Sequence, residues 1–195
     1  MRVPPSGGTY FAKMSLEKNV IAGCKKGDRI AIRHLYEQSA GWMLGVALRY
    51  ISDRNEAMSL VNLSLLNALE KLDSFDENRG EKIEAWLKTI LVRKTIDYMR
   101  KEKLIHEKET NVDALGYDTN MGEGNTRKEE LRSLINRLSP STRSVFNLYA
   151  IEGYKHKEIA EMLHISIGTS KWHLNDARKK LKAMLAVLDT KKIPG

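Results

Sequence analysis

Apolar residues recur every three or four positions through most of this chain, which is the spacing of amphipathic α-helices. In the first half of the chain this pattern covers residues 28–51, 55–72 and 84–101. Asp28 follows a glycine and can cap the first of these helices. Residues 73–80 have the Asp, Asn and Gly content of an irregular loop. No stretch alternates between apolar and polar positions as a half-buried strand would, so we expect an all-α protein.

A second set of helical patterns fills the last third of the chain. The dipeptide Ser139-Pro140 matches an N-cap followed by a proline at the first helical position, and Gly153 is a typical helix stop. Residues 158–163 and 167–181 then form two amphipathic helices separated by a corner of about three residues. Ser166 lies in that corner, where its side chain can accept from free N–H groups of the second helix. The sequence therefore predicts a helix-turn-helix.

The two helices of this motif each have an apolar face. These faces consist of Ile159, Ala160 and Leu163 on the first helix and of Leu174, Ala177 and Leu181 on the second. The outward face of the second helix can reach phosphates and base edges if the helix lies in a major groove. Its residues are Thr169, Lys171, Trp172, Asn175, Arg178 and Lys179. A packed helical pair with a solvated basic face is the alternative interpretation.

The segment between the two helical blocks differs in composition. Residues 103–127 show weak periodicity, several Gly and Asn residues and scattered acids, which is typical of a flexible linker. We therefore expect a helical domain over residues 23–102, then this linker, and a helix-turn-helix domain over residues 128–188. Residues 1–22 form an N-terminal extension, which we expect to be partly disordered because it contains a Pro-, Gly- and Ser-rich run.

The charge of the chain indicates a polyanionic partner. The formal net charge is +8, and a basic surface gains affinity for nucleic acid by releasing condensed counterions. The charge is unevenly distributed, since residues 1–102 carry +4, residues 103–127 carry −2 and residues 128–195 carry +6. Two basic blocks therefore flank an acidic connector.

The sequence lacks the motifs of metal, nucleotide and catalytic sites. It has no glycine-rich nucleotide loop, no Cys-His metal-ligand spacing and no pair of acids in a catalytic context. We therefore expect no cofactor, no metal and no enzymatic activity. The single cysteine, Cys24, cannot form a disulfide within the chain, which fits a reducing cytoplasm. No apolar run approaches the roughly 20 residues of a membrane span, so we expect no membrane insertion.

Short motifs follow one another in a defined order along the two blocks. In the first block they are Asp53-Arg54-Asn55-Glu56-Ala57, Leu60-Val61-Asn62, Phe75-Asp76, Ala85-Trp86-Leu87 and Ile96-Asp97-Tyr98-Met99-Arg100. In the second they are Leu138-Ser139-Pro140, Glu152-Gly153-Tyr154, Glu158-Ile159-Ala160-Glu161-Met162-Leu163 and Ala177-Arg178-Lys179-Lys180-Leu181. The first block resembles region 2, and the second resembles region 4, of the extracytoplasmic-function (ECF, group IV) class of bacterial RNA polymerase sigma factors.

This resemblance implies a cytoplasmic promoter-recognition subunit that binds core RNA polymerase and promoter DNA, with an anti-sigma factor as a further partner. It implies that the outward residues of the recognition helix contact the −35 element. The residues implied for the −10 element are Asp76, Arg79, Lys88, Arg93, Tyr98 and Arg100, of which the last four should lie on the exposed side of their helix. Those implied for core polymerase are Glu56, Leu60, Asn62 and Leu63. The alternative is a helix-turn-helix transcriptional regulator that does not engage core polymerase.

Two parts of the chain depart from the pattern of this class. Ser59 and Leu63 stand where the class usually has acidic residues on the polymerase-binding surface. We therefore expect weaker charge pairing there and an exposed apolar side chain. Ser170 occupies a core position that is usually Val, and its buried hydroxyl needs a hydrogen-bond partner.

Further departures concern single side chains. Lys155 replaces the usual hydroxyl cap of the first helix of the motif. Asp176 puts a negative charge on the face meant for DNA, where it can accept from a cytosine amino group or pair with Lys179 or Lys180. Trp86 lies among apolar neighbours, and we expect it to belong to the core.

Overall fold

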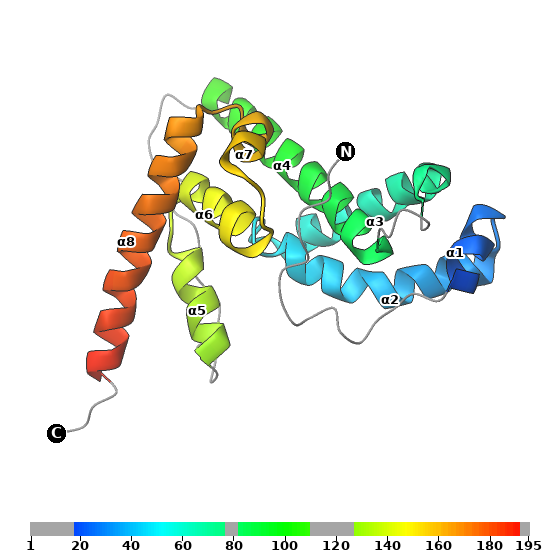
Figure 1. The fold of residues 1–195 in the computed structure, drawn as a ribbon, viewed down its shortest axis with the longest axis horizontal. Helices are drawn as coiled ribbons and strands as arrows, with labels where there is room; N and C mark the ends of the chain where they lie inside the picture. Colours follow the sequence, from blue (N-terminus) through cyan, green and yellow to red (C-terminus); the bar gives the residue numbers. More distant parts are fainter. Residues whose placement is uncertain (1–17, 77–81, 110–126, 192–195) are drawn as a thin grey trace. The chain divides into compact units, whose positions relative to one another are not determined.

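The computed structural model describes residues 18–76, 82–109 and 127–191, and within these ranges all regular structure is helical (Figure 1). The expected all-α fold is confirmed. The chain divides into two compact units, and the division falls between Ile105 and His106. Each unit is described by itself below.

The described part of the first unit is built around three long helices. Its elements are α1 (Lys18–Lys25), α2 (Arg29–Ala47), α3 (Arg54–Glu70), the short 3-10 helix η1 (Leu72–Ser74) and α4 (Ile83–Glu109). The predicted cap of α2 is confirmed, because the Asp28 carboxylate accepts from the N–H of Ile30 at 2.9 Å. Asp53 caps α3 in the same way, accepting from the N–H groups of Asn55 and Glu56 at 2.8 Å each. The buried core includes Leu35, Met43, Leu44, Val61, Leu65, Leu87, Leu91, Val92 and Ile96.

The sequence does not predict helix α1, which packs against α2. Ile21 and Cys24 supply its buried residues. At Gly23 the two helices approach so closely that a Cβ on this glycine would lie 2.6 Å from the Cβ of Ala31. Residues 18–22, which the sequence assigns to the N-terminal extension, are therefore helical and belong to the packing of the first unit.

Helix α4 is longer than expected. It continues to Glu109, so residues 103–109 of the predicted linker are helical. This segment is rich in Lys and Glu, which are good helix formers, and a helix that has already nucleated can extend through such residues without an apolar face. The rest of the predicted linker up to residue 126 lies outside the described residues, as do residues 77–81 of the predicted loop.

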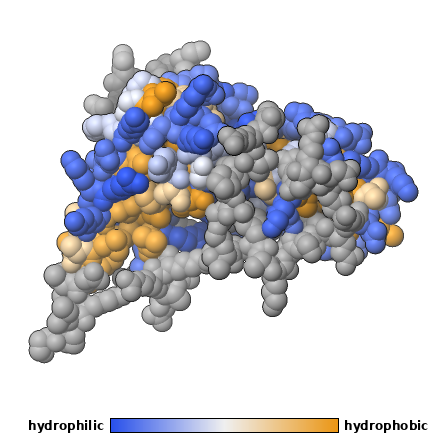
Figure 2. All heavy atoms as spheres, viewed as in Figure 1, coloured by the Kyte–Doolittle hydropathy of each residue, from blue (hydrophilic) through white to orange (hydrophobic). Residues whose placement is uncertain are grey.

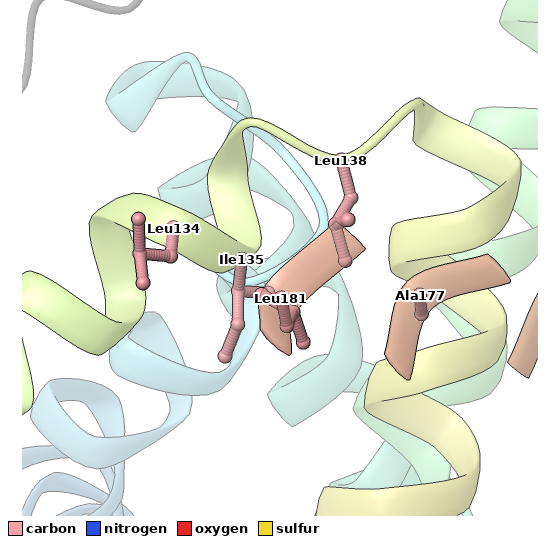
Figure 3. Packing of buried hydrophobic residues seen from close by; sticks show 5 residues of the cluster. All are labelled: Leu134, Ile135, Leu138, Ala177 and Leu181. Atoms are coloured by element: carbon pink, nitrogen blue, oxygen red, sulfur yellow. The ribbon is translucent and has the colours of Figure 1, made fainter. Parts of the chain in front are cut away.

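The described part of the second unit contains four α-helices and one π-helical turn. Its elements are α5 (Arg127–Asn136), α6 (Pro140–Phe146), η3 (Asn147–Ile151), α7 (His156–Leu163) and α8 (Ile167–Lys191). Figure 3 shows how the residues of α5 and of the turn after it lie opposite α8. This cluster consists of Leu134, Ile135, Leu138, Ala177 and Leu181, with Phe146, Ile151, Met184 and Leu188 packed against it.

The predicted helix start at Ser139-Pro140 and the predicted stop at Gly153 are confirmed with one difference. Ser139 is the N-cap residue and Pro140 the first helical residue, but the Ser139 side chain makes no capping hydrogen bond. Gly153 follows η3 with φ +81°, a left-handed conformation that glycine adopts at little cost. This turn reverses the chain, so that α7 can pack against both η3 and α8.

Candidate nucleic-acid interface

The corner between α7 and α8 is held by a dense set of short hydrogen bonds. His164 ends α7 in the left-handed conformation, with φ 52°, and the N–H of Ile165 reaches the Ala160 carbonyl at 3.1 Å. Ser166 Oγ accepts from the N–H of Thr169 at 2.9 Å. The predicted cap and the predicted helix-turn-helix are therefore both confirmed.

The two faces of α8 divide as the sequence predicts. Leu174, Ala177 and Leu181 are buried. On the other side Lys171, Trp172, Asn175, Arg178 and Lys179 are exposed, and Trp172 retains 62% of its surface. Thr169 is only partly exposed, and its hydroxyl lies 2.8 Å from the capping Ser166 Oγ. The exposed side of α8 is therefore a basic surface that also carries an indole, and it is open for contact with a partner.

Ser170 has the hydrogen-bond partner that the sequence demands. Its side chain is fully buried, and its Oγ lies 2.9 Å from Nδ1 of His156 at the start of α7. The His156 ring also stacks on Tyr149, with ring centroids 4.6 Å apart. Burial and the nearby charges of Lys171 and Arg178 lower the pKa of His156, so the ring is neutral at pH 7. We call this set the α7 brace: Tyr149, His156 and Ser170.

A second polar network joins α8 to α6. Thr142 is buried, and its Oγ1 lies 3.0 Å from Nδ1 of His173 and 3.3 Å from Oδ2 of Asp176. Lys180 donates to the same carboxylate at 2.9 Å, and this bond lowers the pKa of the Asp176 carboxyl. We call this set the α6 brace: Thr142, His173, Asp176 and Lys180. Of the alternatives for Asp176, pairing with Lys180 is therefore the one observed.

Two further features of the second unit lie next to the recognition helix. The Lys155 side chain offers no acceptor to α7, and the helix start is held instead by Glu158, whose Oε2 accepts from the N–H of Lys155 at 2.8 Å.

Figure 2 shows hydrophobic residues gathered over α5 and the later part of α8, where Leu131, Leu185 and Val187 are exposed. An open hollow of about 430 Å³ adjoins this patch, lined by Phe146, Arg178, Leu181, Lys182, Leu185 and Ala186. No pattern in the sequence indicates this surface.

The first unit presents part of the set expected for a −10 element. Arg93 is exposed, whereas Tyr98 and Arg100 are partly buried. Arg100 pairs with Asp97 at 2.7 Å. Burial, together with a hydrogen bond to Glu56 of α3, raises the pKa of Tyr98 to about 12.

The three other residues of the expected −10 set are Lys88, Asp76 and Arg79. Lys88 is 5% exposed, so the prediction that it lies on the exposed side of α4 is wrong. Its position one turn after Glu84 puts it on the face of α4 that carries buried residues such as Leu91 and Val92. Asp76 is partly buried, and Arg79 lies outside the described residues.

The residues expected to contact polymerase divide between surface and core. Glu56 and Asn62 are exposed, and Asn62 Oδ1 accepts from the Tyr36 hydroxyl at 3.2 Å. Leu63 is 51% exposed, which confirms the expected apolar side chain on this surface. Leu60 is 5% exposed, so its assignment as a contact residue is corrected: its side chain packs in the core. Leu66, 58% exposed on the same helix, was not among the expected contact residues, although it lies one turn after Leu63 on the same face.

Two remaining expectations concern packing and ligand chemistry. Trp86, which we expected in the core, is only partly buried and packs against Phe75, with ring centroids 5.5 Å apart. Among the described residues, no group of acids, histidines and cysteines could hold a metal ion. Across the same residues, none of the helices combines the length and the hydropathy that crossing a bilayer requires.

Comparison with known proteins assigns both units. A family model described as Sigma-70 region 2 matches residues 35–105, and one described as Sigma-70, region 4 matches residues 128–181. The ECF RNA polymerase sigma factor SigW of Bacillus subtilis (strain 168) is 27% identical over 181 residues, covering 86% of this chain and 96% of SigW. RNA polymerase sigma factor SigZ of the same strain is 31% identical over 141 residues, covering 70% of this chain and 78% of SigZ. The chain belongs to the ECF sigma factors.

The solved structures agree with this assignment at the level of the fold. The sigma factor RpoE of Bartonella quintana, solved in complex with the anti-sigma factor NepR, is 24% identical with a TM-score of 0.51. The match covers 80% of this sigma factor and 96% of that chain. We refer below to the first unit as region 2 and to the second unit as region 4. The alternative of a helix-turn-helix transcriptional regulator that does not engage core polymerase is not favoured, because a sigma region 2 precedes region 4.

Proposed function

We propose that this sigma factor brings core RNA polymerase to promoters in the cytoplasm by placing α8 in the major groove of the −35 element and region 2 on the −10 element. The observation that carries the proposal is the open face of α8, where Lys171, Trp172 and Asn175 project from a helix that buries apolar residues on its opposite side. The protein acts here as a binding subunit rather than as an enzyme, and it requires no cofactor of its own.

The open face of α8 suits both kinds of contact that DNA recognition needs. Lys171, Arg178 and Lys179 can pair with phosphates, which supplies affinity that does not depend on sequence. Trp172 and Asn175 can reach base edges or thymine methyl groups, which supplies sequence preference. Thr169 lies at the same end of the helix and belongs to the proposed DNA-contacting set, although its hydroxyl is hydrogen-bonded to the capping Ser166 Oγ.

Region 2 would hold the −10 element with the exposed side of α4 and the segment before it. Arg93 and Arg100 can attract the displaced strand electrostatically, and Tyr98 offers an aromatic ring to unstacked bases. Asp76 and Arg79 belong to the same proposed surface. The Tyr98 hydrogen bond to Glu56 supports a defined position for the ring.

The proposed polymerase-binding surface lies on α3, with Glu56, Asn62 and Leu63 exposed. Because Ser59 and Leu63 replace acidic residues, this contact would depend less on charge pairing and more on apolar burial. Exposed Leu66 extends the apolar strip by one turn. We include an anti-sigma factor among the proposed partners, since the B. quintana relative is solved with one.

Run-off transcription with purified core polymerase tests this function. We expect promoter-dependent transcripts from at least one template recovered by mapping start sites after overexpression, and retention of the chain on immobilised core enzyme. A chain that neither binds core enzyme nor supports any promoter-dependent transcript would overturn the proposal.

A pair of substitutions tests the division of roles on α8. Lys171→Ala should weaken binding to all DNA sequences and lower the slope of log affinity against log salt by about one unit. Asn175→Ala should cost about 1–3 kcal/mol mainly on the preferred −35 sequence. If Lys171→Ala instead changes the sequence preference while Asn175→Ala does not, the two roles are reversed.

A second pair tests the polymerase surface. Ser59→Asp combined with Leu63→Glu restores the usual acids and should strengthen core binding, most clearly at low salt. Affinity that is already tight and does not change would show that the apolar surface is sufficient as it stands. The salt dependence of the two proteins distinguishes ionic from apolar contact.

A further inference from the structure

The exposed indole of Trp172 contacts the side chain of the next residue, His173. Its ring meets the His173 ring edge-on, with centroids 4.9 Å apart and an interplanar angle of 73°. Adjacent residues of a helix point in directions about 100° apart, so their side chains do not normally face each other. The contact therefore requires the His173 ring to lie in one particular orientation.

The α6 brace supplies that orientation. Thr142 has one hydroxyl hydrogen, which it donates to the Asp176 carboxylate at 3.3 Å. Its oxygen must then accept from His173, so the hydrogen of the neutral imidazole lies on Nδ1. Lys180, one turn further along α8, donates to the same carboxylate of Asp176. The result is a directed series of hydrogen bonds that runs from the His173 ring through the Thr142 hydroxyl to the Asp176 carboxylate, which also accepts from the Lys180 ammonium group.

This arrangement is anchored outside the recognition helix. Thr142 belongs to α6 and is only 1% exposed, so its hydroxyl cannot turn to water. His173 itself is partly buried, and this burial keeps the ring neutral by lowering its pKa. Trp172, in contrast, is largely exposed, and a free indole on a helix surface would sample several rotamers.

We propose that His173 and Thr142 are positioning residues for sequence readout: they fix the Trp172 indole in the orientation that meets the bases before DNA arrives. The inference rests on the proposed placement of α8 in a major groove. A side chain that is already ordered loses less conformational freedom on binding, and the saving for one such residue corresponds to roughly threefold to tenfold in affinity. The gain applies only to DNA whose bases Trp172 contacts, so it appears as sequence preference.

The test uses the full-length chain and duplex DNA. The wild-type chain first enriches duplexes from a random-sequence library, and affinities are then measured for the best duplex and for its scrambled form at one salt concentration. Thr142→Val, which removes the hydroxyl with little change in shape, should lower the ratio of these affinities by roughly threefold to tenfold. Binding to the scrambled duplex should stay within about twofold, and Thr142→Ser should restore the ratio.

Two controls separate positioning from a loss of stability. Thr95→Val removes an equally buried hydroxyl, which donates to the Leu91 carbonyl within α4 of region 2, and it should leave the affinity ratio unchanged. In a Trp172→Ala background, Thr142→Val should have no further effect on the ratio, because the side chain it positions is gone.

Incorporated 5-fluorotryptophan gives a direct readout, since the Trp172 fluorine resonance should shift or broaden in Thr142→Val while those of Trp42 and Trp86 do not.

The outcomes are distinguishable. An unchanged ratio in Thr142→Val, or an equal loss in the Trp172→Ala background, overturns the positioning role and leaves the proposed function intact. A wild-type chain that enriches no sequence at all overturns the positioning role, whereas the proposed function falls only if the chain also neither binds core enzyme nor supports a promoter-dependent transcript. If Thr142→Val does not fold, His173→Phe serves in its place, since it keeps an aromatic ring but lacks the Nδ1 hydrogen that Thr142 accepts.

Discussion

The hydrogen bond between Ser170 and His156 provides the sharpest test of how α8 is held. In the structure Ser170 Oγ is fully buried and lies 2.9 Å from His156 Nδ1. Ser170→Ala removes the hydroxyl and leaves the imidazole nitrogen without this partner. His156→Phe keeps a ring that can stack on Tyr149 but leaves the buried hydroxyl unpaired. The double variant removes both polar groups together.

The expected costs follow from which group is left unpaired. A buried polar group that loses its partner costs about 1–3 kcal/mol. His156 is partly exposed and water can reach its ring, so Ser170→Ala should cost about 1 kcal/mol, even after the gain in helix propensity. His156→Phe should cost about 2 kcal/mol, because the Ser170 hydroxyl has no access to water. The double variant should cost about 1.5 kcal/mol rather than the sum, which is a coupling energy of about 1–2 kcal/mol.

Hydrogen exchange measured by mass spectrometry on the full chain is the suitable assay. A chain with two compact units need not unfold in one step, so a single melting curve does not isolate region 4. Peptides from α7 and α8 report region 4 directly, and each factor of ten in protection corresponds to about 1.4 kcal/mol. Costs that add to within about 0.3 kcal/mol would refute the reasoning, because independent groups behave in that way.

Two further predictions concern pH and backbone packing. Burial lowers the pKa of both His156 and His173 in the folded state. As the pH falls, these histidines therefore take up protons in the unfolded state before they do so in the folded state. The free energy of unfolding of region 4 should be constant above about pH 6.5 and decrease below it. Hydrogen-exchange protection factors of region 4, corrected for the intrinsic exchange rate at each pH, test this at pH 7.5 and 5.5. Equal values at the two pH values would contradict it. Gly23→Ala should destabilise α1 by about 1 kcal/mol, since its Cβ would lie 2.6 Å from that of Ala31. The matched substitution Gly41→Ala, whose Cβ meets nothing within 4 Å in helix α2, should instead stabilise region 2 by up to about 1 kcal/mol, as urea unfolding would show.

Much of the fold could be predicted because the apolar pattern and the caps agree. Asp28 and Ser166 both cap the helices that their positions in the sequence indicate. Two elements were missed for a common reason. Helix α1 has only eight residues, too few for a period to be distinguished. The last turns of α4 contain Leu104 and Ile105 among Lys, Glu and His residues and so carry no repeated apolar stripe to signal a helix.

The candidate site was predictable on α8 but less so on α3 and α4. Lys171 and Asn175 are polar residues on a helix with a clear apolar stripe, so their exposure follows from the period alone. Lys88 and Leu66 break that logic, since a lysine is buried and a leucine is exposed. Their places depend on how three long helices meet, and this information lies in tertiary packing rather than in the local sequence.

The His156 partner of Ser170 and the Thr142 contact of Asp176 could not have been found from spacing, and they show what these unusual residues do. An apolar residue at position 170 would hold α8 by burial alone, which tolerates small rotations about the helix axis because dispersion contacts have little directionality. A hydrogen bond is directional and weakens when its angle changes. Region 4 has one such bond to α7 through Ser170 and another to α6 through Thr142. Together they fix the rotation of α8 about its axis, and that rotation decides which side chains face DNA. Polar residues in the interior of this domain therefore add a directional constraint on its recognition face to the stability that they supply.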